Sequence, residues 1–277
     1  MKAQGAAVVT GASRGIGRAV AIELATRGFD VVATMRDSAA GGGLVEEAGR
    51  VDGRLRVEKL DVTRPETVDL PDGLRVLVNN AGVEREHLPV EETPLELWRE
   101  MFETNLFGLV EVTRRAIPKL RAAGGGVLCN IGSSSILAPV PFYAAYRASK
   151  AAVSALSMTL RAELAPQGIR VVEIMPGPVE SDMLRHSQET AVRPSGEPYQ
   201  SLAEHMNSNK SMVATMIQPA ADAARLIVDA ILDDDGPMRY GCDPMSAGMI
   251  DAWRQGTDED MMRGMLQHLV PQSAGGD

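Results

Sequence analysis

Six short apolar segments, each followed by a stretch with helical periodicity, constrain the fold of this chain more than any other feature. They are mostly continuous runs of valine, leucine, isoleucine and alanine, and they cover residues 6–10, 30–35, 55–60, 74–79, 125–131 and 169–175. Continuous runs of this length are typical of strands buried on both faces of a parallel sheet. The alternation of strand and helix predicts an α/β fold with a doubly wound parallel sheet. Its ligand site is expected at the carboxyl ends of the strands.

Helix start signals lie between these segments. A helical pattern follows the first segment from about residue 15 to residue 28. Residues 93–96 read Thr-Pro-Leu-Glu, a capping box with proline at the first helical position. They predict a helix that runs to about residue 122 and bends at Pro118. Residues 218–219 open another helix, which runs to about residue 234.

Nothing in the sequence divides residues 1–270 into two domains, and we find no repeat with a solenoid period. We therefore expect a single domain, followed by a disordered tail at residues 271–277. Residues 62–73 leave room for only a brief helix between the third and fourth strands, because a parallel crossover itself needs about a dozen residues.

Charge and composition exclude several functions. A formal net charge of −9 argues against nucleic-acid binding, which needs a basic face. The longest uncharged run, residues 122–146, contains glycine, serine, asparagine and proline and is not a membrane span. The two cysteines and four histidines show no metal-ligand spacing, so we predict no metal site. No signal-like apolar core begins the sequence, and we expect a cytoplasmic protein.

A glycine-rich turn follows the first predicted strand. Gly11, Gly15 and Gly17 stand in the order G-x-x-x-G-x-G at the start of the first helix. Glycines there let backbone N–H groups approach a pyrophosphate, and a helix N-terminus favours its negative charge. A tight turn without a ligand can have a similar sequence. The position after the first strand favours a dinucleotide site that includes Ser13 and Ile16.

The end of the second predicted strand indicates which dinucleotide binds. A site for NAD usually has an acidic side chain there, which accepts a hydrogen bond from the ribose 2′-hydroxyl. This chain has Met35 at that place, followed by Arg36, and Arg14 lies next to Ser13 in the glycine turn. Both arginines could be ordinary surface residues. Because guanidinium groups bind phosphate through a planar fork, we expect NADP(H) to be preferred over NAD(H).

Lys150 is the only charged residue between Ala148 and Leu160. It follows Tyr146 by four residues, so the two share a helix face about 6 Å apart in height, whereas Tyr143 lies about 10 Å away. An ammonium group near a phenol favours phenolate and lowers the phenol pKa from about 10. Tyr146 would then be a general acid or base near neutral pH. The alternative is a lysine that extends to solvent beside a packed tyrosine.

Six motifs in order along residues 5–181 closely resemble the short-chain dehydrogenase/reductase family: TGASRGIG, NNAG, NLFG, IGSSS, YRASK and PGPVES. The segments ATMRD and MRYGCDP resemble its hydroxysteroid and retinol dehydrogenase branch. The resemblance implies a Rossmann fold and an NADP-dependent oxidoreductase that acts on a CH–OH group. It also implies a homodimer or homotetramer, with residues 94–122 and 142–165 as the contact surface.

A catalytic tetrad follows from the resemblance. Tyr146 would be the acid/base, and Lys150 would bind the nicotinamide ribose and lower the pKa of the tyrosine. Ser133, rather than either of the two serines that follow it, would hydrogen-bond the substrate carbonyl. Asn105 would hold the water of a proton relay.

The resemblance also implies cofactor contacts beyond the ends of the third, fourth and sixth strands, at Asp61, Val62, Asn79, Ala81, Gly82, Pro176, Gly177, Val179 and Ser181. Asp61 would contact the adenine amino group. Ser181 stands where the family usually has threonine and keeps the hydroxyl for the nicotinamide carboxamide.

Residues 181–217, which we call the lid segment, lie where the family places its helical substrate lid and contain several methionines. Because methionine-rich surface adapts to irregular hydrophobic ligands, we expect a lipophilic ketone or secondary alcohol of hydroxysteroid or retinoid type. Tyr143 and Met183 would contact it beside Ser133 and Tyr146. The methionines could instead be core or oligomer contacts. The alternative substrate is a 3-oxoacyl thioester, and the alternative of another class is a non-catalytic NADP-binding sensor protein.

Overall fold

The computed structural model describes residues 1–49 and 54–269. Its centre is a seven-stranded sheet in the order β3-β2-β1-β4-β5-β6-β7, in which every neighbouring pair is parallel. The strands are β1 (Ala6–Val9), β2 (Asp30–Met35), β3 (Leu55–Lys59), β4 (Leu74–Asn79), β5 (Gly126–Ile131), β6 (Ile169–Ile174) and β7 (Arg239–Tyr240). The six predicted strands are confirmed to within one residue at each end. The two-residue β7 was not predicted.

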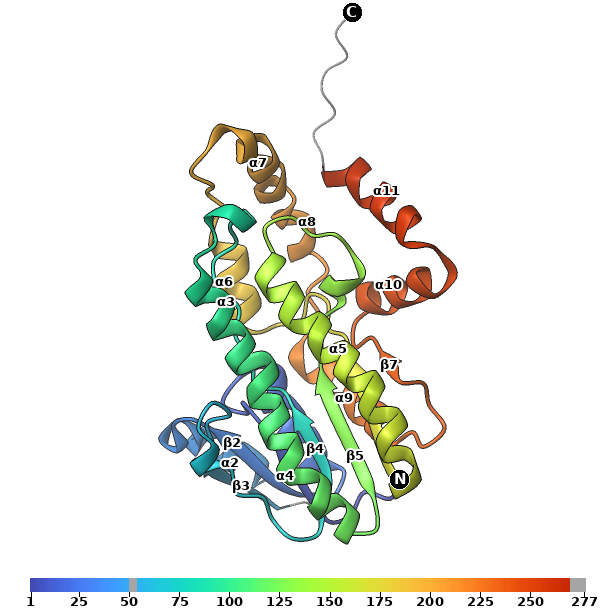
Figure 1. Cartoon of the computed structure of the whole chain (residues 1–277). Coiled ribbons are helices and arrows are strands. Elements are labelled where there is room, and N and C mark those ends of the chain that lie inside the picture. Colours follow the sequence, from blue (N-terminus) through green and yellow to red (C-terminus); the bar gives the residue numbers. More distant parts are fainter. Residues whose placement is uncertain (50–53, 270–277) are drawn as a thin grey trace, which may run out of the picture.

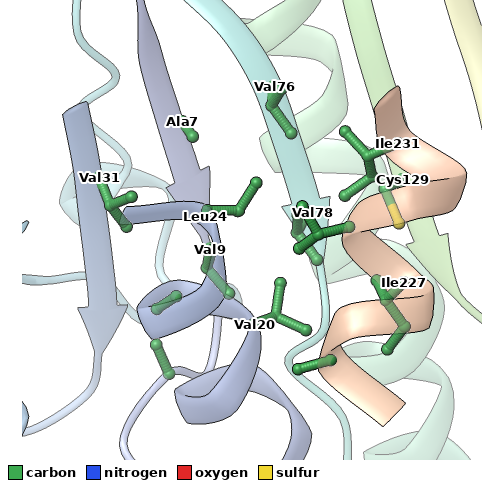
Figure 2. Packing of buried hydrophobic residues seen from close by; sticks show 14 of the residues in the cluster. Ala7, Val9, Val20, Leu24, Val31, Val76, Val78, Cys129, Ile227 and Ile231 are labelled. Carbon is green, nitrogen blue, oxygen red and sulfur yellow. The ribbon is translucent and has the colours of Figure 1, made fainter. Parts of the chain in front are cut away.

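Helices cover both faces of the sheet (Figure 1). On one face, α1 (Gly15–Thr26) and α9 (Ala220–Leu232) pack against β1, β2, β4 and β5. Figure 2 shows Val20 and Leu24 of α1 and Ile227 and Ile231 of α9 against the valines of the strands. On the other face, α4 (Leu109–Ala122) and α5 (Ala144–Leu164) cover the sheet. The doubly wound parallel fold predicted from the sequence is therefore confirmed.

The predicted helix that follows residue 93 is built in three parts. An α-helix, α3 (Leu95–Phe102), continues into a π-helical segment, Glu103–Gly108, and then into α4. The predicted capping box is wrong, because the Thr93 hydroxyl donates to the Pro89 carbonyl at 2.8 Å and the α3 N-cap, Pro94, accepts no side-chain bond. Pro118 lies inside α4, and the departure from α-helical geometry occurs in the π segment instead.

The shorter connections agree with the sequence. The crossover from β3 to β4 contains only a 3₁₀ turn, Pro65–Thr67, as its length predicts. Pro219 is the N-cap of α9, which ends two residues before the predicted position. After β2 the chain forms α2 (Gly42–Ala48), which packs beside α1.

A layer of helices lies beyond the carboxyl ends of the strands (Figure 1). The lid segment forms α6 (Asp182–Glu189), α7 (Gln200–Ser208) and α8 (Lys210–Ala214). Two further helices, α10 (Pro244–Gln255) and α11 (Asp258–Leu269), approach from the opposite side, and α11 contacts α7. None of the helices in the described ranges has the length and apolar character to cross a bilayer. The predicted tail at residues 271–277 lies outside the described residues.

Candidate active site

A cavity of about 1400 Å³ lies at the carboxyl ends of the strands, between the glycine turn and the layer of helices beyond the sheet. This exceeds the roughly 300–1,000 Å³ of a site for one drug-sized ligand, so it has room for a dinucleotide together with a substrate. Apart from Asn79, every predicted cofactor or substrate residue lines it. The structure therefore brings most of the predicted residues to one continuous cavity.

The glycine turn is shaped by close contact with the loop that follows β4. Gly11 and Gly15 have positive φ angles, 65° and 56°, which side chains disfavour. A Cβ on Gly17 would overlap the Asn80 amide and lie 2.6 Å from the Gly11 carbonyl oxygen. The N-cap of α1, Arg14, forms no side-chain cap hydrogen bond, so it leaves the first N–H groups of the helix available to an anion.

Asn80, which the sequence analysis missed, braces this turn. Its Nδ2 donates to the carbonyls of Thr10 and Gly11 at 2.9 and 3.1 Å. The predicted cofactor residue Asn79 does not line the cavity. Its side chain is buried on the face of the sheet that α4 covers, where its Nδ2 donates to Thr113 of α4 and Asn130 of β5, both at 2.9 Å. The structure therefore contradicts the placement of Asn79 at the cavity, which its neighbour Asn80 lines instead, because successive side chains along a strand point to opposite faces.

The adenosine end of the cavity contains no carboxylate at the end of β2. Met35 is buried there, and Arg14 and Arg36 both line the cavity. The first acidic residue after the strand, Asp37, does not line it and accepts a hydrogen bond from the Ala39 N–H at 3.0 Å. Arg14 lies 3.2 Å from a carboxylate oxygen of Asp182.

Asp61 follows the neighbouring strand β3 and lines the same part of the cavity, close enough for the Arg36 charge to act on it. Its Oδ1 accepts hydrogen bonds from both the N–H and the hydroxyl of Thr63, at 3.0 and 2.7 Å. Burial raises the pKa of this carboxyl, but the two Thr63 bonds and the charges of Arg36 and Arg64 more than offset that effect. The net pKa is below its usual range, so Asp61 is ionised and acts as a hydrogen-bond acceptor near neutral pH.

The predicted catalytic side chains come from two elements and meet at the centre of the cavity. Ser133 follows β5, and Tyr146 and Lys150 lie one turn apart on α5. The Tyr146 phenol hydrogen-bonds to Ser133. The Lys150 ammonium donates to the Ile131 carbonyl at 2.9 Å and lies 5.9 Å from the centre of the Tyr146 ring. The structure thus brings these three residues together as predicted.

The electrostatics of this group differ from the sequence prediction. Burial, reinforced by the Glu84 carboxylate, raises the pKa of Tyr146 above its usual range, although the bond to Ser133 opposes the shift. Burial also lowers the pKa of Lys150 to about 8, while Glu173 and Glu84 raise it. The prediction that Lys150 lowers the pKa of Tyr146 is wrong for the side chains of this chain alone. Lys150 is not among the groups that shift the Tyr146 pKa, so its charge does not offset the desolvation of the phenol.

Asn105 lies in the π-helical segment and does not line the cavity. It is buried, and its Oδ1 accepts a hydrogen bond from the Val83 N–H at 2.8 Å. Its Nδ2 donates to the Val83 carbonyl at 3.0 Å and to the Ser149 hydroxyl at 2.9 Å. Asn105 therefore fixes the loop after β4 against α5. Gly82 fits between them because a Cβ there would lie 3.2 Å from Asn105 Oδ1 and 3.5 Å from Lys150 Nζ.

The turn that leaves β6 is fixed to the C-terminal helices. The Gly177 N–H donates to the buried Asp243 carboxylate at 2.7 Å, and Asp243 also caps α10 by accepting from the Ser246 N–H. Ser181 caps α6 by accepting from the Leu184 N–H at 3.1 Å. The sequence analysis missed Asp243, although an aspartate directly before Pro244 is a helix-start signal.

Methionines line the other end of the cavity from two sides: Met183, Met206 and Met212 from the lid segment, and Met245, Met249 and Met261 from α10 and α11. The sequence analysis placed only the first group near a substrate. The spacing of Met245 and Met249, four residues apart on one helix face, could have indicated the second wall. Tyr143 also lies here, where its hydroxyl bonds to Ser187 at 2.9 Å.

A dinucleotide-sized cavity at the carboxyl ends of a doubly wound sheet, with serine, tyrosine and lysine at its centre, is typical of dinucleotide-dependent dehydrogenases. The chain belongs to the short-chain dehydrogenase family, whose model matches residues 5–192. Estradiol 17-beta-dehydrogenase 2 of Rattus norvegicus is 38% identical over 193 residues, which cover 65% of this chain and 50% of that protein. The chain thus spans about half the length of this curated relative.

Solved structures resemble the chain over most of its length. A short-chain dehydrogenase from Streptomyces avermitilis gives a TM-score of 0.75 with 29% identity, and the match covers 95% of both chains. A metagenomic short-chain oxidoreductase in complex with NADP gives a TM-score of 0.58 with 31% identity, over 64% of this chain and 83% of that one.

Proposed function

We propose that the protein is an NADP(H)-dependent oxidoreductase that interconverts a lipophilic ketone and its secondary alcohol. The observation that carries the proposal is the meeting of Ser133, Tyr146 and Lys150 in the cavity that also contains the glycine turn. Bound NADPH would supply a hydride to the carbonyl carbon of the substrate.

The side chains would divide the remaining work. Ser133 donates a hydrogen bond to the carbonyl oxygen and stabilises the charge that develops on it. Tyr146 donates a proton to the same oxygen, and its raised pKa keeps the phenol protonated for this step. Lys150, fixed to the Ile131 carbonyl, has two ammonium protons left to bind the nicotinamide ribose. Asn105 positions the loop on which Gly82 meets the cofactor.

The preference for NADP(H) is supported by the adenosine end of the cavity. Arg14 and Arg36 line it, while the end of β2 offers the apolar Met35 in place of an acceptor for a ribose 2′-hydroxyl. A guanidinium group binds a 2′-phosphate strongly but gains little from a hydroxyl. The NADP complex of the metagenomic relative is consistent with this preference.

A lipophilic substrate is supported by the two methionine-lined walls, since thioether side chains adapt to irregular apolar ligands. The similarity to an estradiol dehydrogenase agrees with a bulky ketone of hydroxysteroid or retinoid type. A 3-oxoacyl thioester remains the alternative substrate. The alternative of another class, an NADP-binding protein without catalysis, is disfavoured because all four side chains of the predicted tetrad are present.

We also propose a homodimer or homotetramer that associates through α3, the π segment, α4 and α5. Three large apolar side chains on this surface, Leu95, Phe107 and Met158, are 63%, 55% and 54% exposed. Burying such a group in an interface removes apolar area from water.

The net charge of −9 offers no general attraction to nucleic acid. We also propose that the protein is cytoplasmic.

The experiment that tests the function is NADPH consumption, with NADH as the control, over steroid ketones, retinal, simple aryl ketones and a 3-oxoacyl thioester. We expect NADPH-dependent turnover of bulky ketones. The Tyr146→Phe variant should lose about 10²–10⁴-fold in kcat and still bind NADPH. Tyr143→Phe, which removes a hydroxyl bonded to Ser187, should lose far less. Wild-type turnover by Tyr146→Phe would refute the catalytic assignment, and NADPH binding without any turnover would favour the sensor alternative.

A further inference from the structure

Glu84 places a carboxylate in the wall of the cavity at the catalytic end. The residue lies two positions beyond Gly82, in the loop after β4, and its side chain is 13% exposed and borders the cavity. Its Oε1 lies 2.6 Å from His87 Nε2. The His87 ring stacks on Tyr143 with the ring centres 3.8 Å apart. The contacts from Glu84 to His87 and from His87 to Tyr143, the N-cap residue of α5, therefore hold one oxygen of the Glu84 carboxylate in place.

The second oxygen, Oε2, takes part in no hydrogen bond or ion pair within the described residues. In the described residues the neighbouring cations form their hydrogen bonds with other groups, while the charges of Lys150 and Lys210 interact with the Glu84 carboxylate. Arg85 pairs with Glu100, and Lys150 donates to the Ile131 carbonyl. On the lid side, Lys210 donates to the Ser187 carbonyl at 2.7 Å. The Oε2 atom of Glu84 remains accessible from the cavity, so a bound ligand can donate a hydrogen bond to it.

Glu84 also lies within electrostatic reach of the reacting group. Burial is the main reason for the raised pKa of Tyr143 and Tyr146, and the Glu84 carboxylate adds to it at both phenols. The substrate carbonyl must lie against Tyr146 to receive its proton. Glu84 therefore lines the same cavity as Tyr146 and lies close enough for its charge to act on that phenol, while methionines of the lid segment, α10 and α11 line other parts of the cavity.

We propose that Glu84, oriented by His87, is a substrate-specificity residue that accepts a hydrogen bond from a donor beside the reacting carbonyl. A carboxylate accepts and does not donate, so the donor must be a hydroxyl or an ammonium group. The substrate class is then a lipophilic ketone with a donor on the adjacent carbon, an α-hydroxy or α-amino ketone, or the corresponding alcohol. The inference rests on the proposed function and narrows its substrate.

The test uses three aryl ketones of matched size that differ only at the α-substituent. They are α-hydroxyacetophenone, α-aminoacetophenone and propiophenone, which carry a hydroxyl, an ammonium and a methyl group. We would measure kcat/KM with NADPH for the wild type, for Glu84→Gln and for Glu86→Gln. Glu86 is the matched control because its side chain is exposed and does not line the cavity.

We expect the wild type to prefer at least one of the two donor ketones over propiophenone by about 10–100-fold, the size of a hydrogen bond to a charged group. Glu84→Gln should reduce that ratio about 10-fold, most for the ammonium compound, while Glu86→Gln keeps it. A larger loss for the amino ketone identifies an ammonium donor, and a larger loss for the hydroxy ketone identifies a hydroxyl.

Two outcomes would overturn the inference and leave the proposed function standing. One is propiophenone turnover by the wild type without a preference for either donor ketone. The other is an unchanged preference in Glu84→Gln, which would make the Glu84–His87 contact purely structural. A wild type that reduces none of the three also overturns the inference, and the wider carbonyl panel then decides the proposed function separately.

Discussion

The ammonium of Lys150 is fixed to the carbonyl of Ile131, the last residue of β5, by a 2.9 Å hydrogen bond. Because Ser133 follows Ile131 by two residues, the same strand end positions the lysine of α5 and the serine that faces it. The Lys150 side chain is buried at the edge of the cavity, and burial lowers its pKa to about 8. Lys150 therefore loses its positive charge as the pH rises through about 8, a range in which enzyme activity can be measured.

We predict that kcat/KM for ketone reduction falls as pH rises through about 8, because Lys150 then loses the charge that binds the ribose. The raised pKa of Tyr146 keeps the phenol protonated across this range, so the tyrosine does not cause the decrease. A pH profile of kcat/KM with NADPH measures it. A flat profile up to pH 10 would contradict the assignment.

The same pKa shift affects stability with a defined sign. The pKa of Lys150 is 10.5 for the free side chain and about 8 in the folded protein, so between these values the unfolded chain binds more protons. The contribution of Lys150 to the free energy of unfolding therefore rises with pH across this window, by up to about 3 kcal/mol. The Lys150→Met variant should lose this pH dependence. Urea denaturation of the wild type and the variant at pH 7.5 and pH 10 measures the free energy of unfolding at both pH values.

A third prediction concerns Glu173, which is fully buried on β6. Its Oε2 accepts hydrogen bonds from Ser154 and Arg239, both at 3.0 Å, and its charge raises the pKa of Lys150. Glu173→Gln keeps the shape and removes the charge, so the alkaline decrease in kcat/KM should begin at lower pH. Ser154→Ala is the control, because it removes one hydrogen bond to the same carboxylate and leaves the charge. If both variants have the wild-type profile, Glu173 does not act on Lys150.

A fourth prediction tests the choice of nucleotide. Arg36→Ser should lower kcat/KM with NADPH by about 10-fold or more and change the value with NADH little, because only NADP has the 2′-phosphate. Arg64→Ser is the matched control: this arginine lies 3.9 Å from Asp61, is 69% exposed and does not line the cavity. An equal loss with both nucleotides would assign Arg36 a structural role.

Much of the fold and of the site could be predicted because it depends on local sequence. The six long strands are apolar runs that can be buried only between two helical layers, and the glycine turn, Ser133, Tyr146 and Lys150 follow them at fixed spacings. The family resemblance supplied the roles of these residues. Their common cavity then follows from the parallel order of the strands.

The features that sequence analysis missed depend on tertiary contacts. β7 has only two residues and forms because it can pair with β6. Asn80 was passed over for Asn79 because a one-residue shift at a strand end reverses the side-chain direction. The raised pKa of Tyr146 depends on burial, which a four-residue spacing does not report. Met245 and Met249 share a helix face, but their place in the cavity wall depends on the return of α10 and α11 across the cavity, which a local spacing does not determine.

The last prediction concerns the tight approach of Gly17 to the loop after β4. A Cβ there would overlap the Asn80 amide and lie 2.6 Å from the Gly11 carbonyl oxygen. Gly17→Ala must therefore move backbone on one side of the glycine turn, at a cost of about 3 kcal/mol in the free energy of unfolding. Because the displaced groups shape the pyrophosphate site, NADPH affinity should fall as well.

Gly43, in the first turn of α2, is the matched control, because a Cβ there would meet nothing within 4 Å. Alanine at this position should leave stability unchanged or raise it by up to about 1 kcal/mol, since alanine is the better helix former. Urea denaturation with and without NADPH measures both variants. Wild-type stability and NADPH affinity in Gly17→Ala would show that the turn can relax around a methyl group. In that case the close contact between Gly17 and Asn80 would not hold the glycine turn in place.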